Sequence, residues 1–403
     1  MKICLHRGLL GSDKHLVFCN DEFFWCTSIP DDAWVYGSTD DTRELSCIID
    51  AVGYEIDPWP SSSHMSAWAC LRGKMGTHVQ WTDVLSPSML KRYTQRTLDH
   101  LQRLLVQYHD TYYMREFLSI REFLGQLNRS HIDANMLRRI IESESNQSNT
   151  HVLRTFMPEE DGMTKRIRYN QSGSVTGRLT VESGPSILTL KKEHRKILKS
   201  RYSDGSIVEI DFSSLEPRIL LSNFNKETED DIYKMISRDL FNESLSRSIV
   251  KIVTLSTLYG SSHKRVSSMI EDKTIDVHLA QKKIREYFSI PSLSRRLSRE
   301  FSENGYINSV FGRKIVPRKN SNHIFINHFI QSTATDFSIL GFKGLCNKLD
   351  THKIRSSPLF VIHDALVLDI HNNDIDKVKK IISSGITLEN FYGTFPISFK
   401  TIS

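Results

Sequence analysis

The spacing of hydrophobic residues along the chain changes at about residue 89. Before this point, short apolar runs at 15–19 and 23–27 have the length and aromatic content that are typical of strands. After it, apolar residues recur at intervals of three and four, which predicts amphipathic helices. The helical segments are 98–105, 117–127 and 136–141, and the polar, serine-rich stretch 142–149 that follows them is predicted to be a loop or linker.

The second half of the chain mixes both periods. Residues 206–210 form a predicted strand that ends at Asp211, and residues 359–370 form two apolar runs joined across His363 and Asp364, which predicts a hairpin. Helical patterns alternate with these strands, so the predicted fold class is α+β with an antiparallel sheet. The predicted helices cover 245–258, 279–288 (interrupted by Pro291) and 322–349.

The N-terminal region is predicted to have a core of its own, because all five tryptophans lie within residues 1–85. These residues are Trp25, Trp34, Trp59, Trp68 and Trp81.

Composition narrows the class of protein only slightly. The chain has 403 residues, 39% of them hydrophobic, which is enough for two or three domains with real cores. A net charge of +6 permits a nucleic-acid partner without requiring one. The six cysteines form no C-x-x-C pair, so reduced thiols are favoured over a metal or disulfide site near the N-terminus. Without a membrane-length apolar run or a signal peptide, we expect a soluble, cytoplasmic protein.

Two aspartates stand where apolar strands end. Asp211 follows the run 206–210, and Asp364 lies at the turn of the predicted hairpin. Acidic residues at turns are usually solvated, but two carboxylates on adjacent strands can bridge the pair of divalent cations used in phosphoryl transfer. Asp369 is left out of this site, because strand alternation from Asp364 is expected to turn it to the opposite face.

The segment between these aspartates contains a basic helix. Arg247, Lys251, Leu255 and Tyr259 are four residues apart, which places them along one helical face. Two cations followed by an apolar and an aromatic residue suit a triphosphate at one end and a base at the other. An ordinary amphipathic helix with solvated cations would show the same pattern.

These segments, in this order, resemble the conserved blocks of family A DNA polymerases, the group of bacterial DNA polymerase I. The residues from Asp211 to Arg218 resemble motif A, those from Arg247 to Gly260 resemble motif B, and those from Val361 to Asp364 resemble motif C. Further matches lie at Thr176-Gly177-Arg178, at Gly305-Tyr306 with Phe311-Gly312-Arg313, and from Ile326 to Asp336.

The resemblance implies a role for each matching residue. Asp211, Asp364 and the Phe212 carbonyl would bind two Mg²⁺ ions, for which Mn²⁺ could substitute. Lys251 would act in catalysis and, with Arg247, contact the triphosphate of the incoming dNTP. Glu216 would exclude a 2′-hydroxyl, Leu255 would pack under the sugar, and Tyr259 would stack beside the template base. The residues implied in binding primer-template DNA are Arg178, Asn327, Gln331, His363 and Arg313.

The same resemblance implies a right-hand polymerase architecture. Residues 176–403 would form the palm and fingers, with the antiparallel sheet in the palm, and residues 111–175 would form a thumb much reduced in size. This short thumb predicts low processivity unless a partner protein acts as a clamp. The basic run 191–196 would either contact DNA phosphates or form a solvated surface.

Residues 1–110 occupy the place of a proofreading exonuclease. They contain no D-x-E motif, and Thr97 stands where an exonuclease motif beginning at Tyr93 needs an aspartate. We therefore expect a degenerate exonuclease remnant without proofreading activity, with an unrelated small module as the alternative.

Some positions depart from the family pattern. Leu255 replaces an aromatic residue, Ala365 replaces the glutamate of motif C, and His323 replaces an arginine. These departures leave open a catalytically inactive homologue that acts as a DNA-binding replisome scaffold. A polymerase that makes RNA primers is a further alternative, although Glu216 argues against it.

Overall fold

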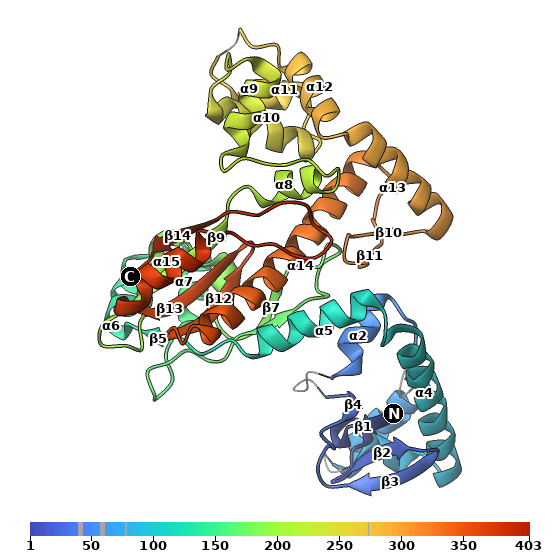
Figure 1. Cartoon of the computed structure of the whole chain (residues 1–403). Helices are drawn as coiled ribbons and strands as arrows, with labels where there is room; N and C mark the ends of the chain where they lie inside the picture. Colours follow the sequence, from blue (N-terminus) through green and yellow to red (C-terminus); the bar gives the residue numbers. More distant parts are fainter. Residues whose placement is uncertain (39–42, 57–60, 77–78, 273) are drawn as a thin grey trace. The chain divides into compact units, whose positions relative to one another are not determined.

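The computed structural model describes the whole chain except residues 39–42, 57–60, 77–78 and 273 (Figure 1). It divides into two compact units, Met1–Arg121 and Glu122–Ser403. The division falls within helix α5 (Tyr112–Gly125). No helix among the described residues is both long and apolar enough to cross a membrane.

The N-terminal unit is built on a four-stranded sheet of order β3-β2-β1-β4. β1 pairs antiparallel with β2 and parallel with β4. Apolar side chains of the sheet pack with helices α2, α4 and α5 into one cluster, and a smaller cluster forms around Val17 and Val35. The N-terminal unit therefore has a core of its own, but residues 98–117, outside the predicted range 1–85, supply much of it. The elements are β1 (Lys2–Leu5), α1 (Arg7–Leu10), β2 (His15–Cys19), β3 (Glu22–Cys26), β4 (Ala33–Tyr36), α2 (Leu45–Val52), α3 (Ser62–Met75) and α4 (Pro87–Tyr108).

The tryptophans contribute little to that core. Among the described tryptophans only Trp81 is buried, and Trp25 on the edge strand β3 is 51% exposed. Trp59 lies outside the described residues. The core consists mostly of aliphatic residues, with Leu98 and Leu101 of α4 completely buried, and its buried aromatic residues include Phe18 and Phe117.

The second unit contains an antiparallel sheet of order β12-β13-β9-β14. The strands are β9 (Gly205–Phe212), β12 (Ser356–Ile362), β13 (Ala365–His371) and β14 (Ile397–Thr401). In the pairing of β9 with β13, Ala365 lies opposite Asp211. The predicted strand and hairpin are therefore confirmed, and β14 adds an edge strand beside β9.

Helix α14 (Asn322–Thr351) packs against this sheet. The ring of Phe212 lies 5.5 Å from that of Phe337 and 5.2 Å from that of Phe342, both on α14. Because side chains alternate along a strand, Asp211 points to the other face of the sheet. This alternation keeps the aspartate out of the apolar layer and available to solvent and ligands.

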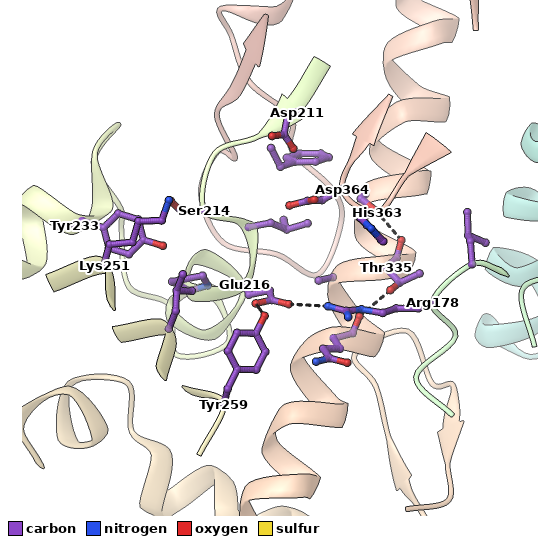
Figure 2. Close-up of a pocket in the computed structure, with 18 residues that line it drawn as sticks. Arg178, Asp211, Ser214, Glu216, Tyr233, Lys251, Tyr259, Thr335, His363 and Asp364 are labelled. Carbon is purple, nitrogen blue, oxygen red and sulfur yellow. Dashed lines mark hydrogen bonds and ion pairs between the residues drawn. The ribbon is translucent and has the colours of Figure 1, made fainter. Parts of the chain in front are cut away.

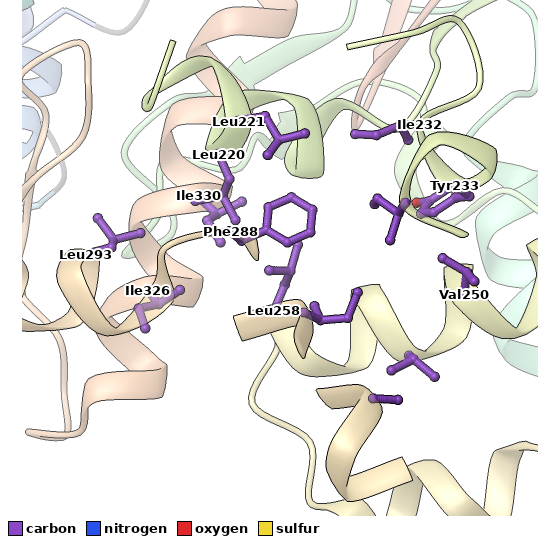
Figure 3. Packing of buried hydrophobic residues seen from close by; sticks show 14 of the residues in the cluster. Leu220, Leu221, Ile232, Tyr233, Val250, Leu258, Phe288, Leu293, Ile326 and Ile330 are labelled. Atoms are coloured by element: carbon purple, nitrogen blue, oxygen red, sulfur yellow. The ribbon is translucent and has the colours of Figure 1, made fainter. Parts of the chain in front are cut away.

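Six helices between β9 and α14 form a second packed region: α8 (Leu215–Ser222), α9 (Ile232–Phe241), α10 (Arg247–Leu258), α11 (His263–Met269), α12 (Val277–Tyr287) and α13 (Ile290–Asn304). Phe288 is completely buried in it, close to Leu220 and Ile330 (Figure 3). Pro291 lies in the first turn of α13, where a proline costs no helical hydrogen bond. The helical prediction for 279–288 therefore ends where a new helix begins.

Smaller elements complete the second unit. Three two-stranded ladders pair β5 with β8, β6 with β7, and β10 with β11. Helix α7 starts inside the polar stretch 142–149, so the loop prediction was wrong there, because Asn146 caps the backbone N–H groups of Ser148 and Asn149. These elements are β5 (His131–Ile132), α6 (Ala134–Ser143), α7 (Gln147–Arg154), β6 (Arg168–Asn170), β7 (Thr180–Ser183), β8 (Leu198–Lys199), β10 (Ile307–Asn308), β11 (Lys314–Ile315) and α15 (Ile375–Ile382).

Candidate active site

Asp211 and Asp364 come together at the ends of β9 and β13. The backbone N–H of Phe212 donates a hydrogen bond to the backbone carbonyl of Asp364 at 3.2 Å. This bond holds the two aspartates side by side at the ends of the neighbouring strands β9 and β13. His363 adopts a left-handed conformation, with φ of 55°, at the turn that presents Asp364. Figure 2 shows both carboxyl groups beside the same cavity. The predicted meeting of two distant strand ends is present in this structure.

The pKa values of both aspartates are raised, so each carboxyl group holds its proton more tightly than it would in water. Burial, followed by repulsion from Asp364, raises the pKa of Asp211 to about 6. Burial also raises the pKa of Asp364. Within the described residues, neither carboxyl group forms an ion pair with a lysine or arginine. A shared cation would relieve this repulsion.

The donor set fits magnesium. Among the described residues, no cluster of three or more His, Cys, Asp or Glu side chains could hold a metal ion. Magnesium is commonly bound by one or two carboxylates, with water and substrate phosphates completing its octahedron. Asp211 and Asp364 therefore suffice on the protein side when a nucleotide supplies the remaining ligands.

The raised pKa of Asp211 predicts a pH-dependent stability of the metal-free protein. Because the folded state binds this proton more tightly than the unfolded state, its stabilising contribution is present below pH 3.8 and is lost as pH rises through about 6. We expect the free energy of unfolding of the wild type, relative to Asp211→Asn, to fall across this range by about 1 to 2 kcal/mol, allowing for solvent screening. Denaturant unfolding of both proteins at several pH values measures the difference, and parallel curves would contradict it.

The aspartates open onto a cavity of about 430 Å³. Its walls come from the ends of β9 and β13, from α8, α9, α10 and α14, and from the loop before β7. The predicted site residues that line it are Arg178, Asp211, Phe212, Glu216, Lys251, Leu255, Tyr259, Gln331, His363 and Asp364.

A row of polar contacts crosses the cavity from α10 to the loop before β7 (Figure 2). The Tyr259 hydroxyl donates to Oε2 of Glu216, and Nη2 of Arg178 lies 3.7 Å from Oε1 of the same carboxylate. Burial raises the pKa of Glu216. Burial and the neighbouring Glu216 charge also raise the pKa of Tyr259, which keeps its phenol a neutral donor. Glu216 lies in the first turn of α8, and these two contacts hold its carboxylate between Tyr259 and Arg178, near Asp364.

Arg247 is not brought into the cavity. Its Nε donates to Asp231 Oδ2 at 2.6 Å, and its guanidinium lies 5.5 Å from the ring centre of Tyr233. Lys251, one turn further along α10, does line the cavity. A role of Arg247 in triphosphate binding stays a prediction, and it requires release from Asp231.

Two of the residues predicted to bind DNA also lie outside the cavity lining. Arg313 is only 4% exposed and forms an ion pair with Asp336, so its guanidinium faces the protein interior. Asn327 lies on α14, and its Oδ1 is buried without a hydrogen-bond partner in the described part of the chain. A DNA contact by Asn327 stays a prediction, and the burial of Arg313 leads to a different role, proposed below.

The structure also adds lining residues that were not expected. Thr335 and Ser338 follow Gln331 at positions i+4 and i+7 of α14, so helical spacing could have identified them. Ser214, which lies within the motif A match, and Tyr233 on α9 line the cavity as well, and Tyr233 carries no comparable signal.

The basic run 191–196 is partly internal. Arg195 is 7% exposed and pairs with the buried Glu209, two residues before Asp211 on β9, while Lys192 Nζ lies 3.5 Å from the same carboxylate. The interpretation of this run as a purely surface feature was therefore wrong for Arg195.

The reason given for excluding Asp369 was also wrong. Asp369 lies opposite Ile207 on β9 and hence on the same sheet face as Asp211, because the hairpin turn breaks the alternation that starts at Asp364. It stays out of the site for another reason. Its carboxylate accepts hydrogen bonds from Ser200 Oγ at 2.5 Å and from the Arg201 N–H at 2.8 Å.

Comparison with known proteins identifies the family of this chain and agrees with its fold. Residues 84–399 match the model of DNA polymerase family A, and the chain belongs to that family. It is 24% identical over 277 residues to the DNA polymerase of Bacillus phage SP01, and 25% identical over 246 residues to DNA polymerase I of Caldicellulosiruptor bescii. These matches cover 57% and 53% of this chain, but only 30% and 28% of those proteins.

A solved structure shows the same fold. It is the POL domain of Pol1 from M. smegmatis, in complex with DNA primer-template and dNTP. The match has a TM-score of 0.66 at 11% identity and covers 96% of this chain and 92% of that one. The predicted family and the predicted α+β polymerase fold are thus confirmed.

Proposed function

We propose that this chain is a template-directed, DNA-dependent DNA polymerase that adds dNTPs to a primer 3′ end. The observation that carries the proposal is the pairing of Asp211 with Asp364 at the mouth of a cavity that Lys251 also lines. Since the chain spans about 30% of the length of its curated relatives, the activity is proposed for the chain itself from its own site.

The two aspartates would hold the divalent cations, with the Phe212 carbonyl as a further oxygen ligand. Such cations lower the pKa of an attacking hydroxyl and neutralise charge on a leaving pyrophosphate. The sheet supplies the rigid spacing, because β9 and β13 are hydrogen-bonded neighbours. Positioning and electrostatic stabilisation supply most of the catalysis in phosphoryl transfer, so this rigidity matters more than any covalent chemistry.

The α10 side chains would bind the incoming nucleotide. Lys251 can donate to the phosphates from the cavity wall, and Arg247 can join it once it leaves Asp231. Movement of α10 toward the sheet would bring the basic side chains of Lys251 and Arg247 closer to the two aspartates. Closure that assembles a site only around the correct pair is a source of specificity.

Sugar and primer recognition would come from the opposite walls. Glu216, which contacts Tyr259 and Arg178, would exclude a 2′-hydroxyl from the cavity. Arg178, Gln331 and His363 can contact the minor-groove side of the primer terminus, where acceptors are similar for every base pair. Such contacts test the shape of a base pair without reading its sequence.

A reduced thumb predicts low processivity for the isolated chain. Between β5 and Thr176 the structure has only two short helices, α6 of 10 residues and α7 of 8. Fewer phosphate contacts weaken DNA binding, and each one lost lowers the salt dependence of binding by about 0.9 in the logarithmic slope. Extension in the presence of a DNA trap is expected to yield short products, and long products from single binding events would contradict the prediction.

We also propose that the chain lacks proofreading. Strand β1 consists of Lys2–Leu5 and carries no carboxylate, and no D-x-E motif occurs in residues 1–110. Incubation with a mismatched primer and no dNTP should leave the primer intact. Excision of the mismatch would overturn this part of the proposal.

Primer extension with each dNTP omitted in turn tests the proposed activity. Synthesis should stop one position before each template base that calls for the missing nucleotide, and Asp364→Ala should abolish it. DNA binding without any incorporation would instead favour the inactive scaffold, for which Ala365 in place of the motif C glutamate is the motivating departure. Preference for rNTPs would favour a primer-synthesising enzyme.

A further inference from the structure

A buried ion pair lies behind the cavity wall and belongs to none of the groups that line the cavity. Arg313, in the turn before β11, donates from Nη2 to Asp336 Oδ1 at 2.6 Å and from Nε to Oδ2 at 3.2 Å. The two side chains are 5% and 2% exposed. Such a forked contact in a dry environment fixes both partners in orientation as well as in distance.

The same guanidinium also holds the loop that carries Arg178. Nη1 of Arg313 donates to the Gln171 carbonyl at 3.2 Å. Gly177 has φ of +71°, and a Cβ at this position would lie 2.4 Å from Arg313 Cζ. The guanidinium therefore packs directly on the backbone of the Gly177 turn, an approach that only glycine allows.

Arg178 depends on this support for its position. Its side chain is 50% exposed, and its ion pair with Glu216 is long, at 3.7 Å. A long, half-exposed side chain held by one weak contact is oriented mainly by its backbone. The backbone of Arg178 directly follows Gly177, on which the Arg313 guanidinium packs.

We propose that the Arg313–Asp336 pair is a positioning device that aims Arg178 at the primer terminus, and that Arg313 does not itself contact DNA. The pair connects three segments that are distant in sequence: the loop 171–178, the turn before β11 and helix α14. The inference rests on the proposed polymerase function, because it assigns a role to a residue of that site. It replaces the DNA contact that the sequence suggested for Arg313.

If the Arg313–Asp336 pair had only a structural role, its removal would have different effects. Loss of a buried ion pair should then lower stability and leave the kinetics of the folded protein unchanged. A positioning role should lower kcat/KM, and it should do so through Arg178. A double-mutant cycle between the two arginines separates these possibilities, because residues that act through one another show non-additive effects.

The test uses the full chain and two ways of changing the pair. Arg313→Lys keeps the charge but loses the fork. The double variant Arg313→Met with Asp336→Leu replaces both charges by apolar groups, so no unpaired charge is left buried. Arg355→Met is the control for loss of an ion pair away from the site: Arg355 pairs with the buried Asp374 at 2.9 Å, at the end of β12 opposite to Asp364, although its own side chain is 49% exposed and Asp374 also pairs with Lys377.

All three proteins should unfold cooperatively, and the shift in Tm should be smaller for Arg355→Met, because Arg355 is half-exposed and Lys377 still pairs with Asp374. We expect both changes at Arg313 to reduce kcat/KM for primer extension by about tenfold to 100-fold, as misplacement of a contact residue does. Arg178→Ala should cause a similar loss, Arg178→Ala combined with Arg313→Lys should lose no more than Arg178→Ala alone, and Arg355→Met should extend primers like the wild type.

Independent, multiplying losses from Arg178→Ala and Arg313→Lys would overturn the inference. So would wild-type extension by Arg313→Lys and by the apolar pair when Arg178→Ala is impaired. If the wild type extends primers but Arg178→Ala does so equally well, the positioning role falls while the polymerase proposal stands. Failure of the wild type itself would overturn the proposed function and this inference with it.

Discussion

Asp364→Asn is expected to reduce nucleotide incorporation by on the order of 10³-fold, because under the proposed mechanism a divalent cation held by Asp211 and Asp364 would supply about 4 kcal/mol of transition-state stabilisation. Asparagine keeps the size and one oxygen of the side chain but removes the charge that attracts a divalent ion. The backbone contact between Phe212 and Asp364 does not involve the side chain, so the sheet should persist. Single-nucleotide incorporation under saturating dNTP measures the effect.

The same substitution should not destabilise the metal-free protein. Because Asp364 raises the pKa of Asp211 by repulsion, its neutralisation should leave the free energy of unfolding unchanged or higher at neutral pH. Asp376→Asn is the matched control, since its carboxylate is 98% exposed on α15 and should be silent in both assays. More than a tenth of wild-type incorporation by Asp364→Asn would contradict the proposed role.

Glu216→Ala should relax the selection of deoxynucleotides over ribonucleotides by about 10- to 100-fold, which corresponds to the 1–3 kcal/mol typical of a steric clash that is removed. The Glu216 carboxylate accepts a hydrogen bond from the Tyr259 hydroxyl and pairs with Arg178. These two contacts restrict the movement of its side chain away from an incoming sugar. Alanine creates room for a 2′-hydroxyl. The ratio of kcat/KM for a dNTP to that for the matching rNTP measures the selectivity.

Tyr259→Phe separates size from hydrogen bonding. Phenylalanine removes the contact with Glu216 but leaves the carboxylate in place, so most of the selectivity should remain. An equal loss of selectivity in Tyr259→Phe and Glu216→Ala would mean that the hydrogen bond, and not the bulk of Glu216, excludes ribonucleotides.

The sequence predicted the elements whose hydrophobic pattern is strong. The strand before Asp211, the hairpin around Asp364 and helix α14 all carry long, regular patterns, and each is found with small shifts of its ends. The strand-end position of the two aspartates followed from the same patterns. Their resemblance to family motifs then connected segments that hydrophobic periodicity alone could not bring together.

Other features depend on packing that no local pattern reveals. Helix α3 has no buried residue among those described, and hence no apolar stripe that could predict it. The ion pair of Arg247 with Asp231 joins residues 16 positions apart across a helix boundary. Likewise, the burial of Arg195 against Glu209 turns a charge run that looks solvated into an internal contact, and only the tertiary structure shows it.

The role of Arg313 illustrates the same limit. Its position in a family block suggested a DNA contact. In the structure its guanidinium instead forms an ion pair with Asp336, 23 residues further along the chain, and packs on the Gly177 turn. A motif identifies which residues matter near a site. The burial of its guanidinium is the observation from which we propose that Arg313 supports Arg178 and does not contact DNA.

The most direct test of the central claim is the binding of Mn²⁺ in place of Mg²⁺ to the complex of this chain with primer-template and a non-hydrolysable dNTP, measured by electron paramagnetic resonance. We expect the wild type to bind two ions that are lost together in Asp211→Asn and in Asp364→Asn, while Asp376→Asn binds as the wild type does. Unchanged Mn²⁺ binding in either single variant would contradict the claim that the two carboxylates share the catalytic metals.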